Sequence, residues 1–121
     1  MFFNLVSGSC CYKVRAWYRT KNNAYDQQSE HFGYYTMQPG TVNGKAHYKS
    51  TDGNSGIWYE DLQGVGVWNV GKMEHFGFAG KFSSFSNSDC PYYRTGYSWS
   101  YLDQYENFRD ADEGFSIVCK S

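Results

Sequence analysis

Short runs of alternating apolar and polar residues recur along this chain, and turn-forming residues separate each run from the next. The run YKVRAWY at 12–18 places Tyr, Val and Ala on one face and Lys and Arg on the other. Gly, Asn, Asp and Pro return about every eight to twelve residues, a spacing typical of antiparallel strands. The pattern predicts an all-β fold, a small antiparallel β-sandwich or barrel. Its expected strands are 12–18, 33–37, 45–49, 56–60, 65–70, 76–82, 97–101 and 114–119.

Two stretches carry more specific local signals. VNGKAHYK at 42–49 contains Asn43 and Gly44, the strongest short signal for a two-residue hairpin turn. In 102–110, by contrast, Leu102, Tyr105 and Phe108 recur at three-residue spacing. A single helical turn or a 3₁₀ stretch is therefore the alternative to a strand in that segment.

Aromatic residues dominate the apolar part of the composition. Phe, Tyr and Trp make up 21% of the chain and outnumber Leu, Ile and Val by about two to one. Disordered chains are poor in aromatics and carry a large net charge, whereas the net charge here is −1. We therefore expect a folded chain, and its 121 residues predict one domain, 1–121.

Four cysteines stand at 10, 11, 90 and 119, without the CxxC spacing of zinc ribbons and redox sites. Such a distribution is typical of a small secreted domain whose ends are joined by disulfides. Three pairings exist, and a vicinal bridge would need a strained ring. Strand alternation puts Cys10 on the face of Val14, and Cys119 on the face of Ile117. We therefore predict Cys10–Cys119 on the core side and Cys11–Cys90 on the other.

The same alternation predicts a set of core residues and a first strand. Core positions are expected at Tyr12, Val14, Tyr18, Phe115 and Ile117. The start, MFFNLVSGSC, is apolar like the second half of a secretory signal, but it is short and lacks basic residues. We interpret this start, with its Phe and Leu at 3 and 5, as a first strand.

The charge balance argues against a nucleic-acid partner. Eleven basic residues face twelve acidic ones, and the longest basic cluster is Lys13, Arg15, Arg19 and Lys21. We interpret that cluster as an ordinary solvated strand face. No apolar run approaches the roughly 20 residues of a membrane span.

The tetrapeptide Glu-His-Phe-Gly occurs twice, at 30–33 and at 74–77. The flanking residues do not repeat, so we interpret the two copies as strands that begin alike rather than as a duplication. His31 and His75, with Glu30 or Glu74, would be the ligands of a zinc site if the strands lie side by side. The spacing does not enforce such a site, and half-buried or surface histidines are the preferred interpretation.

A second metal hypothesis concerns calcium. The segment 103–113 is acidic, with only Arg109 opposing it, but it lacks the glycine-centred spacing of an EF-hand. We expect an acidic loop and no cofactor, with calcium binding as the alternative. Its acidic residues are Asp103, Glu106, Asp110, Asp112 and Glu113.

Catalytic motifs are missing from the sequence. No serine elbow, P-loop or HExxH sequence is present, and the four cysteines are assigned to bridges. Glu60 and Asp61 are neighbours on a strand, so their carboxylates point to opposite faces and suit glycoside hydrolysis poorly. The sequence predicts a non-enzymatic protein.

The tryptophans and tyrosines provide the candidate ligand site. A small sandwich cannot bury so many aromatics on its inner faces, and an exposed ring beside oxygen acceptors suits a sugar. Two stretches place such groups on one strand face, and a sugar is expected to stack on their tryptophans. They comprise Asp52, Asn54, Trp58 and Glu60 in the first, and Trp99, Tyr101 and Asp103 in the second.

Several features together resemble a disulfide-bonded β module of secreted and multidomain extracellular proteins of marine invertebrates. They are the NGKxxY sequence at 43–48, IWY at 57–59, WxVG at 68–71, Cys-Pro at 90–91, Trp99 and the closing Cys119. The resemblance covers 10–119 and implies an extracellular module without implying functional residues.

The function predicted from the sequence is therefore an extracellular, non-enzymatic, lectin-like binding module, with a glycan or an extracellular protein as its partner. The alternative is a structural or adhesive matrix protein that acts through surface tyrosines.

Overall fold

One antiparallel β-sheet accounts for most of the structure. The computed structural model describes residues 10–18, 29–75, 82–92, 99–102, 107–110 and 115–120, and in this part of the chain all regular structure is β-strand or short 3₁₀ helix. The all-β prediction is confirmed. The strands are β1 (Lys13–Tyr18), β2 (Gly33–Met37), β3 (Tyr48–Ser50), β4 (Ser55–Leu62), β5 (Val65–Lys72), β6 (Phe82–Phe85), β7 (Ser100–Leu102), β8 (Phe108–Asp110) and β9 (Phe115–Lys120). The 3₁₀ helices are η2 (Ser29–His31) and η3 (Met73–His75).

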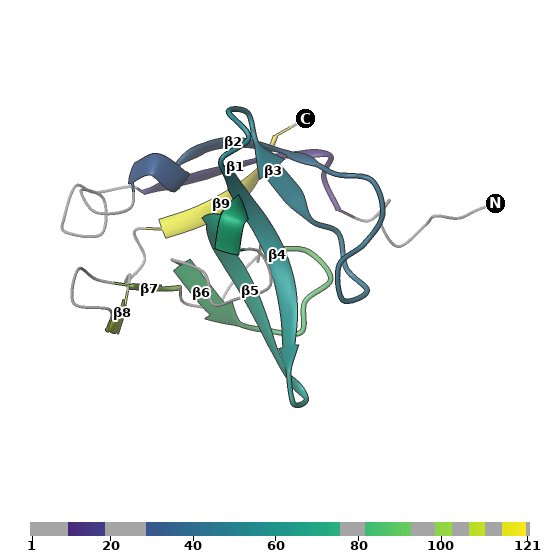
Figure 1. The fold of residues 1–121 in the computed structure, drawn as a ribbon, viewed down its shortest axis with the longest axis vertical. Helices are drawn as coiled ribbons and strands as arrows, with labels where there is room; N and C mark the ends of the chain where they lie inside the picture. Colours follow the sequence, from purple (N-terminus) through teal and green to yellow (C-terminus); the bar gives the residue numbers. More distant parts are fainter. Residues whose placement is uncertain are drawn as a thin grey trace.

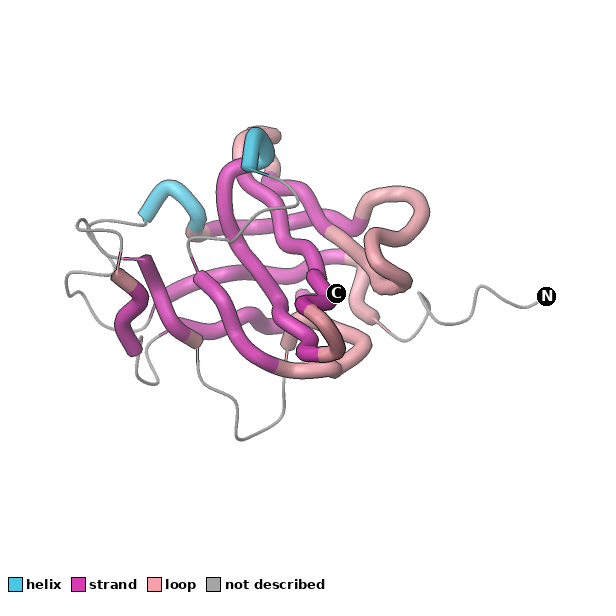
Figure 2. Tube along the Cα trace, turned by 60° about the horizontal axis from the view of Figure 1, so that its bottom comes forward, coloured by secondary structure: helices cyan, strands magenta, loops and turns pink. Residues whose placement is uncertain are grey.

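The strand order makes the sheet curl. Strands β1 to β8 pair in chain order, and β9 then pairs with β1 at the opposite edge from β8. Nine strands laid flat would hold these edges about 38 Å apart. Only residues 111–114 join Asp110 to Phe115, and five residue steps span at most about 18 Å. The sheet must therefore bend round into the open, barrel-like curl visible in Figures 1 and 2.

Aromatic rings fill the inside of this curl. The rings of Phe82 on β6 and Phe115 on β9 stack with centroids 4.0 Å apart, and Trp99 meets Phe115 edge-on at 5.1 Å. These contacts link parts of the sheet that are far apart in the strand order. The aromatic rings fill the volume that the few aliphatic side chains of the core leave open. The predicted core residues Val14, Phe115 and Ile117 are confirmed as buried.

The other two predicted core positions have different outcomes. The prediction that Tyr12 belongs to the core is wrong, because this residue is 69% exposed. Strand β1 begins only at Lys13, so the strand alternation cannot be extended back to residue 12. The side chain of Tyr18 lies outside the described residues, as does the strand expected around residues 3–5.

The hairpin and the helix predictions can also be compared with the structure. Asn43 and Gly44 have φ values of 54° and 83°, and the backbones of Val42 and Lys45 exchange two hydrogen bonds around them. This two-residue turn confirms the hairpin. The helical alternative for 102–110 is wrong where the structure describes it, because Phe108–Asp110 is strand β8, paired with β7.

Both disulfides form, but with the opposite pairing to the predicted one. Cys10 bonds to Cys90 and Cys11 bonds to Cys119. The alternation argument failed because both N-terminal cysteines precede β1 and because Cys119 lies in the exposed end of β9. The bridges enclose 80 and 108 residues, and each contributes about 4.5 kcal/mol in the chain-entropy account.

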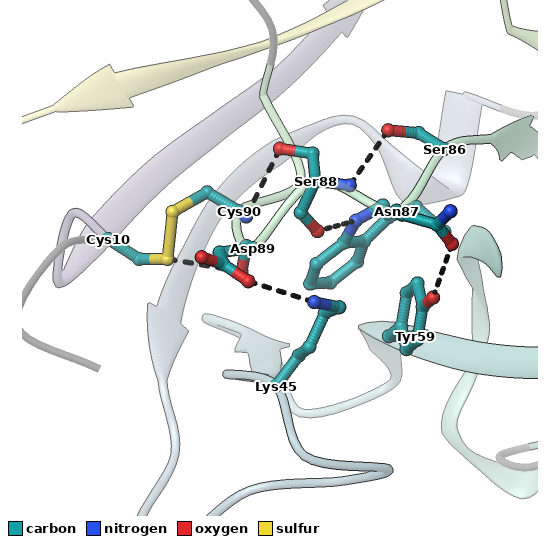
Figure 3. Close-up of polar contacts among 9 residues, drawn as sticks. Cys10, Lys45, Tyr59, Ser86, Asn87, Ser88, Asp89 and Cys90 are labelled. Carbon is teal, nitrogen blue, oxygen red and sulfur yellow. Dashed lines mark hydrogen bonds and ion pairs between the residues drawn. A yellow bond between two sulfur atoms is a disulfide. The ribbon is translucent and has the colours of Figure 1, made fainter. Parts of the chain in front are cut away.

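The first disulfide anchors the loop at 86–90, whose polar contacts are shown in Figure 3. The indole Nε1 of Trp68 donates to the Ser88 carbonyl at 2.9 Å, and the Tyr59 hydroxyl donates to Asn87 Oδ1 at 3.0 Å. Lys45 Nζ forms an ion pair with Asp89 at 2.9 Å. The loop at 86–90 is thus fixed by buried aromatic donors as well as by Cys90.

The outer face of the sheet differs between its two halves. On β4 and β5, Trp58, Val67 and Asn69 alternate with the inner residues, yet their side chains are at most 4% exposed. Trp58 also stands apart from the inner cluster of buried residues. Strands β4 and β5 are therefore covered on both faces, whereas β9, β1, β2 and β3 are covered on one.

Candidate functional site

The two tryptophans expected to stack on a sugar are structural. Trp58 is fully buried on the outer face of β4, and Trp99 is 3% exposed within the aromatic cluster of the inner face. Neither ring offers a face to a ligand. The prediction failed because alternation shows which residues share a face but does not show which face is covered.

The polar partners of these tryptophans are dispersed. Asp52 and Asn54 are exposed in the turn before β4, while Glu60 lies near the far end of that strand. Tyr101 is half-buried, with its ring 6.4 Å from that of Phe82. Asp103 lies outside the described residues. The predicted site is therefore not assembled from these groups.

Asp52 instead organises its own turn. Its Oδ1 accepts hydrogen bonds from the Ser50 hydroxyl at 2.7 Å and from the Asn54 backbone N–H at 2.9 Å. The Ser50 hydroxyl bond, followed by the backbone bond of Asn54, lowers the pKa of the Asp52 carboxyl. Gly53 adopts a φ of 81°, which explains a glycine at this position.

The repeated Glu-His-Phe-Gly sequence has a structural explanation. Each copy begins in a 3₁₀ helix, η2 or η3, rather than in a strand, so the interpretation as two strands that begin alike is wrong. Glu30 and Glu74 line one pocket of about 350 Å³, together with Asn54 and Lys72. The repeat therefore brings two carboxylates to one place, with a lysine that balances part of their charge.

The histidine of the first copy has a packing role. His31 is fully buried, and its Nδ1 lies 2.8 Å from the Ser55 hydroxyl oxygen. The Tyr35 hydroxyl donates to the His31 carbonyl at 2.6 Å, and burial raises the pKa of Tyr35. The side chain of His75 lies outside the described residues, so the zinc hypothesis rests on the sequence alone.

The described ranges contain no cluster of three or more metal-ligating side chains. Most of the acidic segment proposed for calcium, 103–113, lies outside these ranges, and its described part runs from Asn107 to Asp110. The calcium alternative for that segment therefore rests on the sequence alone.

A groove at the end of strands β1 and β2 was not predicted. It has a volume of about 340 Å³, and its sides are formed by the ring of Tyr12 and by the loop after β2. Its lining residues are Tyr12, Met37, Gln38, Pro39, Gly40 and Thr41. The only sequence signal for it was Tyr12, which the alternation had placed in the core.

The loop side of the groove is firmly held. The Met37 N–H donates to the Tyr12 carbonyl at 2.8 Å, and the Gln38 N–H donates to the His47 carbonyl at 2.9 Å. The Gln38 side-chain amide donates to the Thr36 carbonyl at 3.0 Å, which fixes the amide plane and leaves its oxygen as an acceptor. Within the described part of the chain, the hydroxyls of Tyr12 and Thr41 bond to no protein group, so both remain available to a ligand.

Comparisons of the chain with models of known protein families, with curated proteins and with solved structures find no match. The arrangement of the site therefore has to be interpreted from its own chemistry. Among the residues that the structure describes, none belongs to a helix with the length and apolarity needed to cross a membrane.

Proposed function

We propose that this protein is a secreted, non-enzymatic binding module whose ligand is a carbohydrate, bound in the groove beside Tyr12. The observation that carries the proposal is the combination of an exposed aromatic ring with uncommitted polar groups on a fixed loop. A sugar has an apolar C–H face for the ring and hydroxyls for the Gln38 oxygen and the Thr41 hydroxyl. Two intramolecular disulfides are consistent with an oxidising compartment.

The groove also suits binding rather than catalysis. None of its six lining residues carries a carboxylate, an imidazole or a thiol, so it offers no strong general acid, base or nucleophile. Its hydrogen-bonded loop is ordered before a ligand arrives, which reduces the entropy lost on binding.

A glycan-array screen followed by titration of the Tyr12→Ala variant tests this proposal. We expect Tyr12→Ala to weaken binding about fivefold or more, because a stacking aromatic contributes on the order of 1 kcal/mol. Phe85→Ala is the matched control, since Phe85 is also 69% exposed but lies on the distant strand β6. An array without a hit, or equal binding by Tyr12→Ala and wild type, would contradict the proposal.

One observation favours the alternative, an adhesive protein that associates with further copies of itself. Leu62, Val65 and Phe85 are 54%, 50% and 69% exposed at the tip of the β4–β5 hairpin and the end of β6. An exposed apolar group of this kind is typical of an association surface. Sedimentation velocity distinguishes the two functions: concentration-dependent association that Phe85→Ala abolishes, without any glycan binding, would support adhesion.

A further inference from the structure

The outer face of β9, β1, β2 and β3 gathers cations from distant parts of the sequence. Lys120 of β9 pairs in register with Lys13 of β1, Lys13 pairs with Thr36 of β2, and Thr36 pairs with Lys49 of β3. Three lysines thus lie in one row across four adjacent strands. Arg15 lies in the next row on the same face, two residues along β1. We call Lys13, Arg15, Lys49 and Lys120 the basic face.

These cations are exposed and have no carboxylate partners in the part of the chain that the structure describes. All four side chains are exposed, and none forms an ion pair with a described acidic residue. Lys45, by contrast, is half-buried and pairs with Asp89. By alternation and register, the other positions of this face are neutral residues: Trp17, Tyr34, Thr36, Ser116 and Val118. Asp52, three residues after Lys49, is engaged by its own turn.

Aromatic rings hold two of the cations in place. Lys13 Nζ lies 5.3 Å from the centroid of the Tyr34 ring, and the Arg15 guanidinium lies 5.4 Å from the ring of Trp17. The guanidinium also lies 6.0 Å from the Tyr34 ring. Cation–π contacts restrict these long side chains without neutralising them. The positive charge therefore stays on the surface in a defined arrangement.

Repulsion among these cations lowers the stability of the folded state, and a bound anion would relieve it. Lys13 and Lys120 are directly opposite in an antiparallel pair, where like charges are destabilising. Neighbouring strands are about 4.8 Å apart, so the row from β9 to β3 extends over roughly 14 Å. A row of regularly spaced charges on an open sheet face is complementary to an extended chain that carries regularly spaced anions.

We propose that the basic face is a second carbohydrate-binding surface, and that its ligand is an anionic polysaccharide bearing sulfate groups. Sulfate oxygens accept the hydrogen bonds that lysine and arginine donate, and the sugar rings contact the exposed part of Tyr34 and Val118. A nucleic acid is disfavoured as the occupant, because all four cysteines are oxidised, as is typical of an extracellular compartment, where sulfated polysaccharides rather than nucleic acids are the common polyanions. This surface is distinct from the Tyr12 groove, so its existence does not depend on binding there.

Titration with dextran sulfate and with unsulfated dextran of the same length tests this inference. We expect a sulfation-dependent affinity that falls with added NaCl, by up to about one power of the salt concentration for each cation that contacts the chain. The double variant Lys13→Gln/Lys120→Gln should lose about tenfold or more of this affinity while its melting temperature is unchanged or higher. The matched control Lys45→Gln/Lys72→Gln has the same net charge and should bind dextran sulfate as wild type does.

Three results would overturn the inference. They are equal loss of affinity in both double variants, equal binding of sulfated and unsulfated dextran, and competition by duplex DNA as effective as that by dextran sulfate. The Tyr12→Ala variant separates the two surfaces, because it should retain dextran sulfate binding even if the groove proves to bind no sugar.

Discussion

The two halves of the sheet use their outer faces differently. On β4 and β5 the outer side chains of Trp58, Val67 and Asn69 are buried, so these strands are covered on both faces at these positions. On β9, β1, β2 and β3 the outer positions are exposed or half-buried, and four of the exposed ones carry cations. Figure 1 shows both halves as parts of one continuous curled sheet.

This difference separates stability from recognition. A strand that is buried on both faces contributes to the folded state at every position, whereas a strand that is buried on one face leaves alternate positions free for ligand contacts. The Tyr12 groove and the basic face both belong to the half that is covered on one side. Changes to outer-face residues should therefore affect folding in one half and binding in the other.

The largest expected effect on stability comes from replacing an outer-face tryptophan, and it should differ between the two halves of the sheet. Trp58→Ala should lower the free energy of unfolding by about 3–5 kcal/mol, because it removes a fully buried side chain. Trp17→Ala, on the half-buried outer position of β1, should lower it by about half as much or less. Urea unfolding measures both. Equal losses would remove the distinction between the halves.

Loss of the first disulfide should have the next largest effect. Cys10→Ser/Cys90→Ser removes a bridge that encloses 80 residues, and we expect the free energy of unfolding to fall by about 2–5 kcal/mol. Non-reducing peptide mapping of the wild type checks the pairing itself. Peptides linked as Cys10–Cys119 would contradict the structure.

A smaller loss is expected at Gly66 in β5. A methyl group there would collide with the Tyr59 hydroxyl, Asn87 Oδ1 and the Ser86 carbonyl, two of which belong to the loop at 86–90. Gly66→Ala should lower the free energy of unfolding by about 1–3 kcal/mol. Ser116→Ala, at an outer position of β9, is the control and should change it by less than about 0.5 kcal/mol. A Gly66→Ala protein as stable as this control would show that the loop can move aside.

The smallest expected effect is the pH dependence contributed by Asp52. Hydrogen bonds from Ser50 and Asn54 lower its folded pKa, so its stabilising contribution is present above the unfolded pKa of about 3.9. The contribution is lost as the pH falls through the lower folded value. Melting curves of wild type and Asp52→Asn between about pH 5 and about pH 2 should therefore converge at the acidic end. Parallel curves over this range would contradict the role of the carboxylate.

The sequence predicted the secondary structure better than the site for a physical reason. Strands, the Asn43-Gly44 turn and the presence of two disulfides depend on local alternation and composition. The choice of cysteine partner depends on where β1 begins, and local alternation does not determine that boundary. In the sequence, Lys13 and Arg15 resemble an ordinary solvated face, because Lys49 and Lys120 join them only through strand register.

The candidate site was predicted least well because exposure depends on the whole sheet. Trp58 and Tyr12 were assigned by the same alternation rule, and each proved to have the opposite exposure. The rule assumes that one face of every strand is solvated. It fails where β4 is covered on both faces and where residue 12 precedes its strand.

Lysine footprinting with and without dextran sulfate tests the central claim most directly, namely that carbohydrate binds to the half of the sheet that is covered on one face. Reductive methylation followed by mass spectrometry reports the reactivity of each lysine in the full chain. We expect dextran sulfate to protect Lys13, Lys49 and Lys120 and to leave Lys45 and Lys72 as reactive as before. Protection of Lys45 and Lys72 to the same extent, or protection of no lysine at all, would contradict this claim.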